Sequence, residues 1–194
     1  MTLTLVTAPT EEPITLDEAK AHLRVDATDE DDVIGPLIEA ARQHVENFTH
    51  RALITQTWDL KLDGFPSGDL ELPLAPLLTS TAPVVTYTDS AGASQTWASS
   101  NYTVDAPSGP WARRGRLFLN YGILYPSTRS IDQAVSIRFL CGYGGPASVP
   151  EPIKLAMKLL FGHWYANREA VNVGNITSEY PQAVDALLWP FKSF

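Results

Sequence analysis

Five side chains in this 194-residue sequence are of the types that most often ligate metals or act as nucleophiles. They are His22, His44, His50, His163 and Cys141. Their spacing matches no zinc or catalytic motif, because the sequence contains no HExxH, CxxC or GxSxG pattern. Cys141 follows Phe139 and Leu140, which favours a buried small hydrophobe over a nucleophile. We therefore predict no catalytic residue, no metal site and no cofactor.

An alternative function involves Arg168 and Glu169, which follow a predicted helix, and the glycine-rich turn at residues 141–146. In a pocket with perturbed titratable groups, these would suit a small hydrolase or a nucleotide-binding enzyme. The turn has neither the GxGxxG spacing nor the lysine of a phosphate-binding loop. A structural ion pair and a strand-to-helix turn are the commoner explanations, so a small enzyme is only the alternative hypothesis.

Acidic side chains gather in the first part of the chain. Residues 1–50 hold eleven of the 22 acids against three of the 14 bases, which accounts for the whole net charge of −8. A chain with that distribution is a poor candidate for tight nucleic-acid binding. The densest group is Asp26, Asp29, Glu30, Asp31 and Asp32. Because it lacks the EF-hand spacing, we interpret it as helix capping and a solvated acidic face rather than a cation site.

The basic cluster of the sequence is Arg113, Arg114 and Arg116, close to Trp111. Such a group would allow a nucleic-acid-binding module or a contact with the tail, with Trp111 adding a stacking surface. More often a cluster of this kind only solubilises a hairpin. A nucleic-acid contact is therefore a second alternative.

The elements that position these residues begin with helices. Thr15 and Glu18 have the spacing of a capping box, which predicts a helix start. Thr28 is the predicted cap of a second helix, whose apolar stripe runs from Ile34 to Phe48. Gly35-Pro36 predicts a kink, or a short turn before the main helix, because proline lacks the amide hydrogen.

The middle of the chain changes to short β-rich runs separated by turn residues. Predicted strands are 55–62, 69–72, 84–88, 102–104, 116–119 and 134–140, with a turn at Asp89–Gly92. A further helix should open at Pro150-Glu151-Pro152, and a last one from Pro181 through Leu188, stopped by Pro190. The chain ends on the aromatic residues Trp189, Phe191 and Phe194. Large apolar groups at a terminus should dock on this subunit or on another.

We therefore predict an α+β fold, with a helical bundle formed by the N- and C-terminal helices and an inserted β-rich module. The expected parts are residues 1–52 (N-terminal helices), 53–145 (β-rich module) and 146–194 (C-terminal helices and tail), within one structural domain. No signal peptide, transit peptide or membrane-spanning segment is expected. The lone cysteine fits folding in a reducing cytoplasm.

Several segments, in order along the chain, resemble phage head-tail connector (adaptor) proteins. The opening matches are residues 13–20 (PITLDEAK), 22–25 (HLRV), 31–32 (DD) and 40–42 (AAR); the middle matches at 58–60 (WDL); the closing matches are 142–143 (GY), 149–154 (VPEPIK), 164–169 (WYANRE) and 187–191 (LLWPF). The resemblance covers both helical ends well and the centre loosely.

This resemblance implies a structural subunit of a ring, usually a dodecamer, under the portal of a tailed phage or a gene transfer agent. The expected location is the neck of the particle, and the subunit would be made in the host bacterial cytoplasm. Implied partners are the portal protein and a stopper or tail-completion protein; DNA would pass through without specific binding. The implied portal-binding residues are Leu188, Trp189, Phe191 and Phe194. The acids Asp26, Asp29, Glu30, Asp31 and Asp32 would line the DNA channel.

Overall fold

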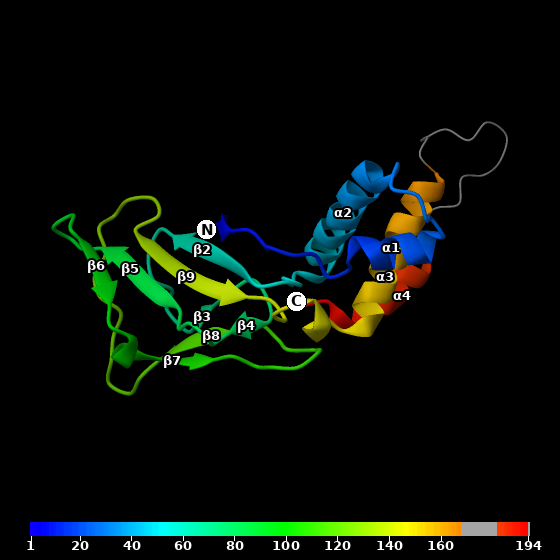
Figure 1. The fold of residues 1–194 in the computed structure, drawn as a ribbon. Coiled ribbons are helices and arrows are strands. Elements are labelled where there is room, and N and C mark those ends of the chain that lie inside the picture. The colour runs from blue at the N-terminus through cyan, green and yellow to red at the C-terminus, as the bar shows by residue number, and fades with distance from the viewer. Residues whose placement is uncertain (168–181, 194) are drawn as a thin grey trace.

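The computed structural model describes residues 1–167 and 182–193, which contain both helices and sheets. The predicted α+β class is confirmed. Figure 1 shows the helices gathered at one end of an elongated molecule and the strands at the other. Helices from the two halves of the sequence thus lie together, although the β-rich segment separates them along the chain.

The helices of the described residues come from both ends of the chain. They are α1 (Leu16–Leu23), α2 (Asp31–Thr49), α3 (Glu151–Ala166) and α4 (Gln182–Leu188), and a 3-10 turn (Trp189–Phe191) follows α4. Helix α3 contacts each of the other three. Their shared core includes Ile34, Ile38, Met157, Leu160 and Phe161, all fully or almost fully buried. Burial of these side chains is the main force that holds the helices to one another.

Helix α1 begins as the sequence predicts. The Glu18 amide donates to Thr15 Oγ1 at 3.2 Å, and the Thr15 amide donates to Glu18 Oε2 at 2.9 Å. Two amides that would otherwise lack partners are thereby satisfied. The helix ends at Arg24, whose left-handed backbone (φ 59°) closes the last turn.

Helix α2 departs from the prediction in two ways. Its cap position is Glu30 rather than Thr28, because Thr28 instead accepts the Asp31 amide in a preceding turn through its backbone carbonyl. The helix also continues through Pro36 without interruption. Buried Ile34 and Ile38 anchor the backbone on both sides of the proline, so packing outweighs the lost hydrogen bond.

The strands form two antiparallel sheets. They are β1 (Thr2–Thr7), β2 (Gln56–Leu62), β3 (Leu70–Glu71), β4 (Leu77–Leu78), β5 (Val84–Thr88), β6 (Ser94–Trp97), β7 (Tyr102–Asp105), β8 (Arg116–Leu119) and β9 (Val135–Cys141). One sheet has the order β1-β2-β9-β5-β6, with β4 also paired to β9, and the other has the order β3-β8-β7. A second core, which includes Leu60, Leu72, Ile137 and Phe139, belongs to these strands.

Strands β1, β4 and β6 are absent from the prediction. For β1 and β6 a signal was present: β1 alternates threonine and leucine, and β6 directly follows the predicted turn at Asp89–Gly92. That turn is present, with Asp89 Oδ1 accepting the amides of Ala91 and Ala93 at 3.0 and 2.9 Å. Strand β4 has two residues, too few for a periodic pattern.

The glycine-rich turn at 141–146 lies where the strands meet the helices. The Tyr143 amide donates to Leu53 O, and the Thr55 amide donates to Gly144 O. Gly142 has φ +126°, and a Cβ there would lie 2.4 Å from the Ile54 carbonyl oxygen. Two of the connections between the helical and β-rich parts, from α2 to β2 and from β9 to α3, therefore cross in close backbone contact.

Candidate partner-binding surfaces

The C-terminal aromatic residues occupy different environments. Leu188 is fully buried and Phe191 is 3% exposed, both in the core of the helices, whereas Trp189 is 61% exposed. Phe194 lies outside the described residues. Leu188 and Phe191 thus contribute to the folding of their own subunit, and in this conformation they are not available to a partner. Of the expected portal-binding set, Trp189 is the exposed residue among those described.

The segment around Trp189 is held against the end of α2. The Ser193 amide donates to Thr49 O at 2.9 Å, and Arg51 Nε donates to Phe191 O. Arg51 is only 2% exposed, and its burial lowers the pKa of the guanidinium although the Tyr143 hydroxyl lies close by. Burying a charged group costs free energy unless the group is hydrogen-bonded. The Phe191 carbonyl supplies a hydrogen bond to the buried Arg51 guanidinium, and this contact fixes the position of the C-terminal segment.

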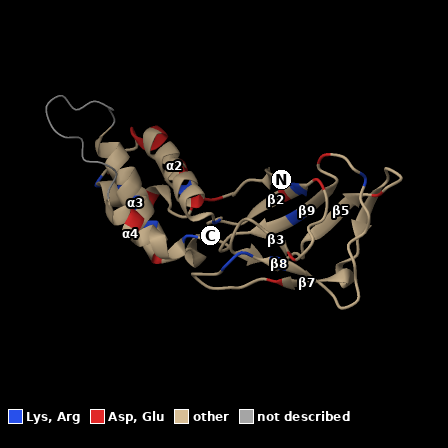
Figure 2. Ribbon diagram, turned by 180° about the vertical axis from the view of Figure 1, so that it is seen from behind, with Lys and Arg blue, Asp and Glu red and all other residues tan. Residues whose placement is uncertain are grey.

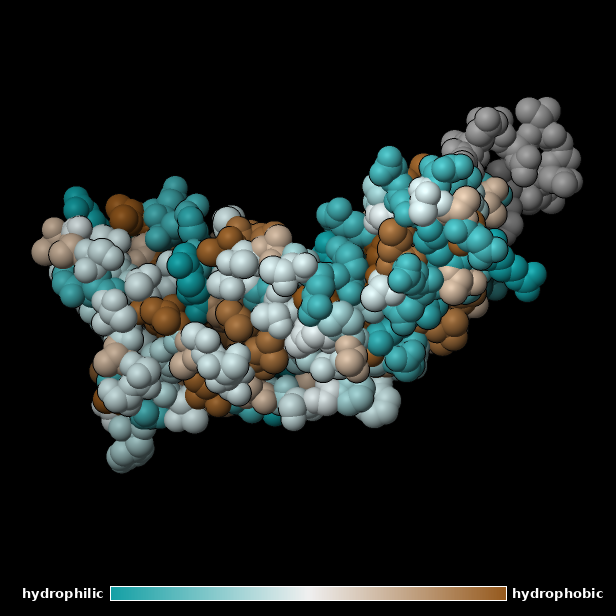
Figure 3. All heavy atoms as spheres, viewed as in Figure 1, coloured by the Kyte–Doolittle hydropathy of each residue, from teal (hydrophilic) through white to brown (hydrophobic). Residues whose placement is uncertain are grey.

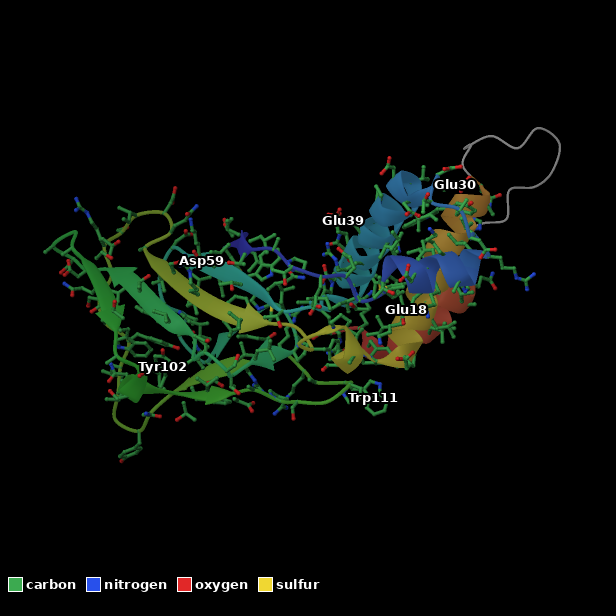
Figure 4. All side chains as sticks on the ribbon, viewed as in Figure 1. Glu18, Glu30, Glu39, Asp59, Tyr102 and Trp111 are labelled. Carbon is green, nitrogen blue, oxygen red and sulfur yellow. The ribbon has the colours of Figure 1, made fainter. Side chains whose placement is uncertain are left out.

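Trp111 reaches the same place from the β-rich part. Its ring stacks 6.3 Å from that of Phe191, and the Tyr143 hydroxyl donates to Pro110 O at 2.8 Å. Figure 4 shows Trp111 near the base of the helices, at the tip of the loop that precedes β8. Trp111 is 66% exposed. Sequence analysis grouped it with the arginines, and only the fold places it beside the C-terminal segment.

The acidic group lies at the end of the helices farthest from the strands, where Figure 2 shows the ribbon at the start of α2 coloured red for acidic residues. Asp26, Asp29 and Asp32 are exposed. The other two are engaged: Asp31 pairs with Lys20 Nζ at 2.7 Å, and the Glu30 carboxylate accepts the Tyr165 hydroxyl. In Figure 3 hydrophilic residues gather mainly over this helical end.

The arginine cluster is largely neutralised by neighbouring groups. Arg113 lies 3.4 Å from Asp105, and Arg114 lies 3.0 Å from Glu71. The Arg116 guanidinium stands 5.5 Å from the centre of the Phe118 ring. These contacts fit the interpretation of the cluster as a solubilised hairpin.

A buried polar network that sequence analysis missed joins α2 to the first strand of the β-rich part. Arg42 binds Glu12 at 2.8 Å and Glu46 at 3.0 Å, and Glu46 accepts the Leu53 amide and the Gln56 side chain at 2.8 and 2.6 Å. Burial raises the pKa of Glu46, because desolvation outweighs these bonds. The i,i+4 spacing of the arginine and glutamate was visible in the sequence, but their burial was not.

The chemical groups offer little that an enzyme would use. In the part of the chain that the structure describes, no cluster of three or more His, Cys, Asp or Glu side chains could hold a metal ion. Cys141 is buried, and desolvation raises the pKa of its thiol. Arg168 and Glu169, on which the enzyme alternative rests, lie outside the described residues. None of the described helices is long and apolar enough to cross a membrane.

Two clefts lie between elements of the part of the chain that the structure describes. One of about 460 Å³ lies between β1 and α2, lined by Leu3, Leu5 and Trp58 and by the polar network. Another of about 490 Å³ lies between the loop at 107–110 and residues 142–151. Within the first cleft, Arg42 pairs with both Glu39 and Glu46, as expected for a structural joint.

Comparison with known proteins agrees with this fold. The family described as "Phage gp6-like head-tail connector protein" matches residues 13–75. A solved structure described as the neck of an empty gene transfer agent (GTA) particle, computed with C6 symmetry, has a TM-score of 0.79 and 26% identity, and the match covers 100% of this chain and 96% of the other. The neck of a native GTA particle, computed with C12 symmetry, has a TM-score of 0.77 and 25% identity, and the match again covers 100% of this chain and 96% of the other.

A third structure, the virion of a native gene transfer agent particle, is similar in fold, with a TM-score of 0.77, 24% identity and again 100% and 96% coverage. A search of curated proteins finds no match. The α+β fold is therefore that of neck components of phage-like particles. The resemblance to head-tail connector proteins that the sequence predicts is confirmed.

Proposed function

We propose that this protein is a head-tail adaptor: a structural subunit of the neck of a tailed phage or a gene transfer agent, joining the head to the tail. The observation that carries the proposal is the whole-chain likeness to a neck component, at a TM-score of 0.79, 26% identity and full coverage of this chain. The family match over residues 13–75 supports it independently through sequence. The subunit acts through the surfaces it presents to neighbouring proteins.

The subunit works as a member of a ring, in keeping with the C6 and C12 symmetry of the similar necks. Twelve copies would form a ring that extends the DNA channel, in which each copy meets the next through two different surfaces. The end of the helices farthest from the strands carries the acidic group, which we call the acidic corner; Asp26, Asp29 and Asp32 are its exposed members. An acidic channel wall repels phosphates, so DNA passes without being held.

Partners bind at opposite faces of such a ring. The portal contact is made by the C-terminal segment, with Trp189 as its anchor, because a large exposed aromatic side chain on a firmly docked segment is the usual centre of an interface. The stopper or tail-completion protein binds the other face. The β-rich module then separates the two contacts and fixes the spacing between them.

The two alternative functions lack comparable support. The ion pairs of Arg113 and Arg114 leave little free positive charge for a nucleic-acid interface. The enzyme hypothesis rests on Arg168 and Glu169, which lie outside the described residues. Both similar necks and the family point to assembly rather than to chemistry.

The test is a particle that lacks this protein. Deletion of its gene should yield filled or unstable heads without tails, and electron microscopy of complete particles should locate the protein between portal and tail as a ring. Particles that keep their tails and still deliver DNA after the deletion would refute the adaptor function.

A further inference from the structure

Strand β1 ends the six-stranded sheet with an open edge. In the described part of the chain β1 pairs with β2 alone, from Thr2 opposite Lys61 to Thr7 opposite Thr57. Its other edge therefore presents backbone N–H and C=O groups to the outside, at the margin of the β-rich part where Figure 1 marks the N-terminus. Such an edge is a template for one more strand.

The sequence of β1 does little to discourage that pairing. Natural sheets protect their edges with charges, prolines or bulges, and Thr-Leu-Thr-Leu-Val-Thr has neither a charge nor a proline. One bulge, between Leu5 and Thr7, limits the regular edge to Thr2–Leu5. Leu5 and Val6 are more than 40% exposed. The strand is thus short, apolar and accessible.

The edge also carries no negative charge of its own, although the chain has a net charge of −8; the adjoining Lys61, opposite Thr2, is positive. Residues 1–10 contain no charged side chain. On the neighbouring strands, Asp59 and Arg138 form a two-point ion pair at 2.8 Å. Two copies of this edge can therefore approach each other without the repulsion that the acidic helices would cause.

The pattern of β1 is complementary to itself. When identical strands pair antiparallel about a twofold axis, each residue stands opposite one from the same face, because side chains alternate with period two. With the axis at Thr4, Leu3 stands opposite Leu5 of the second copy, within the regular part of the edge. Leucines then meet leucines on the face that borders the cleft between β1 and α2.

We propose that β1 is a self-association site, through which two copies of the free protein pair antiparallel about Thr4 and join their sheets into one. The partner is a second copy of this chain. This inference does not rest on the proposed function. A cyclic ring has no twofold axis between its members, so the pair belongs to the free protein and opens when subunits enter a ring.

The first test is the mass of the purified full-length chain by light scattering over a range of concentrations. The expected mass rises from that of one chain, 21.3 kDa, towards twice that value. Thr4→Lys should keep the mass at one chain, because two like charges would stand directly opposite each other. Thr96→Lys, on the opposite edge strand β6, is the matched control and should still dimerise. Thermal unfolding of both variants verifies that they fold.

The second test fixes the register. Residues directly opposite in an antiparallel pair lie within reach of a disulfide, so Thr4→Cys should give a covalent dimer on mild oxidation. Ser94→Cys, exposed on β6, is the control, and the native Cys141 is buried and does not interfere. A native chain that stays at 21.3 kDa throughout, or crosslinking at position 4 no greater than at position 94, would overturn the proposal.

Discussion

At the scale of single residues, two positions show how local geometry decides stability. Thr15 caps α1 with its hydroxyl, whereas the hydroxyl of Thr28 caps no helix. Thr15→Ala should therefore lower the free energy of unfolding by about 1 kcal/mol. Thr28→Ala should change it by less than about 0.5 kcal/mol. Chemical denaturation of both variants measures the difference, and equal losses would contradict the capping geometry.

The same cap predicts a dependence on pH. The hydrogen bond from the Thr15 backbone amide lowers the pKa of the Glu18 carboxyl below its ordinary value of 4.5, so the folded state favours the ionised form. The stabilisation is therefore present above pH 4.5 and is lost as the pH falls through the lower pKa of the folded state. Glu18→Gln should weaken this acid dependence in urea melts between neutral and acidic pH. A variant whose stability falls as steeply with acid as that of the native chain would exclude this contribution.

Gly142 offers a matched pair with Gly109. Both have positive φ, but a Cβ at Gly142 would collide with the Ile54 carbonyl, whereas Gly109 has open space. Gly109→Ala should cost about 1 kcal/mol for the backbone conformation alone. Gly142→Ala should cost at least about 2 kcal/mol, since strain and collision add. Similar losses of unfolding free energy for the two variants would show that the backbone contact between Gly142 and Ile54 can relax.

At the scale of elements, the C-terminal segment separates folding from binding. Phe191→Ala should lower the free energy of unfolding by about 3 to 5 kcal/mol, because it empties a buried site. Trp189→Ala should leave it within about 1 kcal/mol yet abolish capture of the portal in a pull-down. Retained portal capture by Trp189→Ala would move the interface elsewhere. Trp111→Ala then tests whether the adjacent exposed aromatic takes part.

Truncation is a poor tool for the same question. Removing the residues after Leu188 would delete the Phe191 side chain and the Phe191 carbonyl that accepts a hydrogen bond from Arg51. It would also remove the hydrogen bond from the Ser193 amide to the Thr49 carbonyl. The shortened chain would lose core packing and leave a buried guanidinium without its acceptor. Single surface substitutions are therefore needed to test binding.

At the scale of the whole molecule, the distribution of charge is the property to test. Replacing Asp26, Asp29 and Asp32 by asparagine removes three charges from the acidic corner. If that corner lines the channel, assembled particles should deliver DNA more slowly, because phosphates would meet less repulsion. The control replaces three exposed aspartates elsewhere, Asp17, Asp69 and Asp132, and should deliver at the native rate. Equal delivery by both triple variants would contradict the channel position.

Much of the architecture could be predicted because it depends on local signals. The capping box at Thr15, the proline-flanked start of α3 and the turn at Asp89 each satisfy nearby backbone groups. Strands β5 and β8 have the predicted limits, because their β-branched and apolar runs end at turn residues. At Pro36 the local rule allowed a kink or a short turn, and the unbroken helix contradicts the short turn.

By itself the sequence determined the α+β class, the acidic first segment and the resemblance to head-tail connectors, since composition and short-range spacing encode them. Only the tertiary structure decided which side chains are buried and which are exposed to solvent. Leu188 and Phe191 are buried and Trp189 is exposed, because successive residues of a helix point about 100° apart around its axis. Trp111 meets Phe191, and Arg51 meets the same residue, across 80 and 140 positions of sequence. Contacts at such separations depend on the packing of whole elements, which no local pattern records.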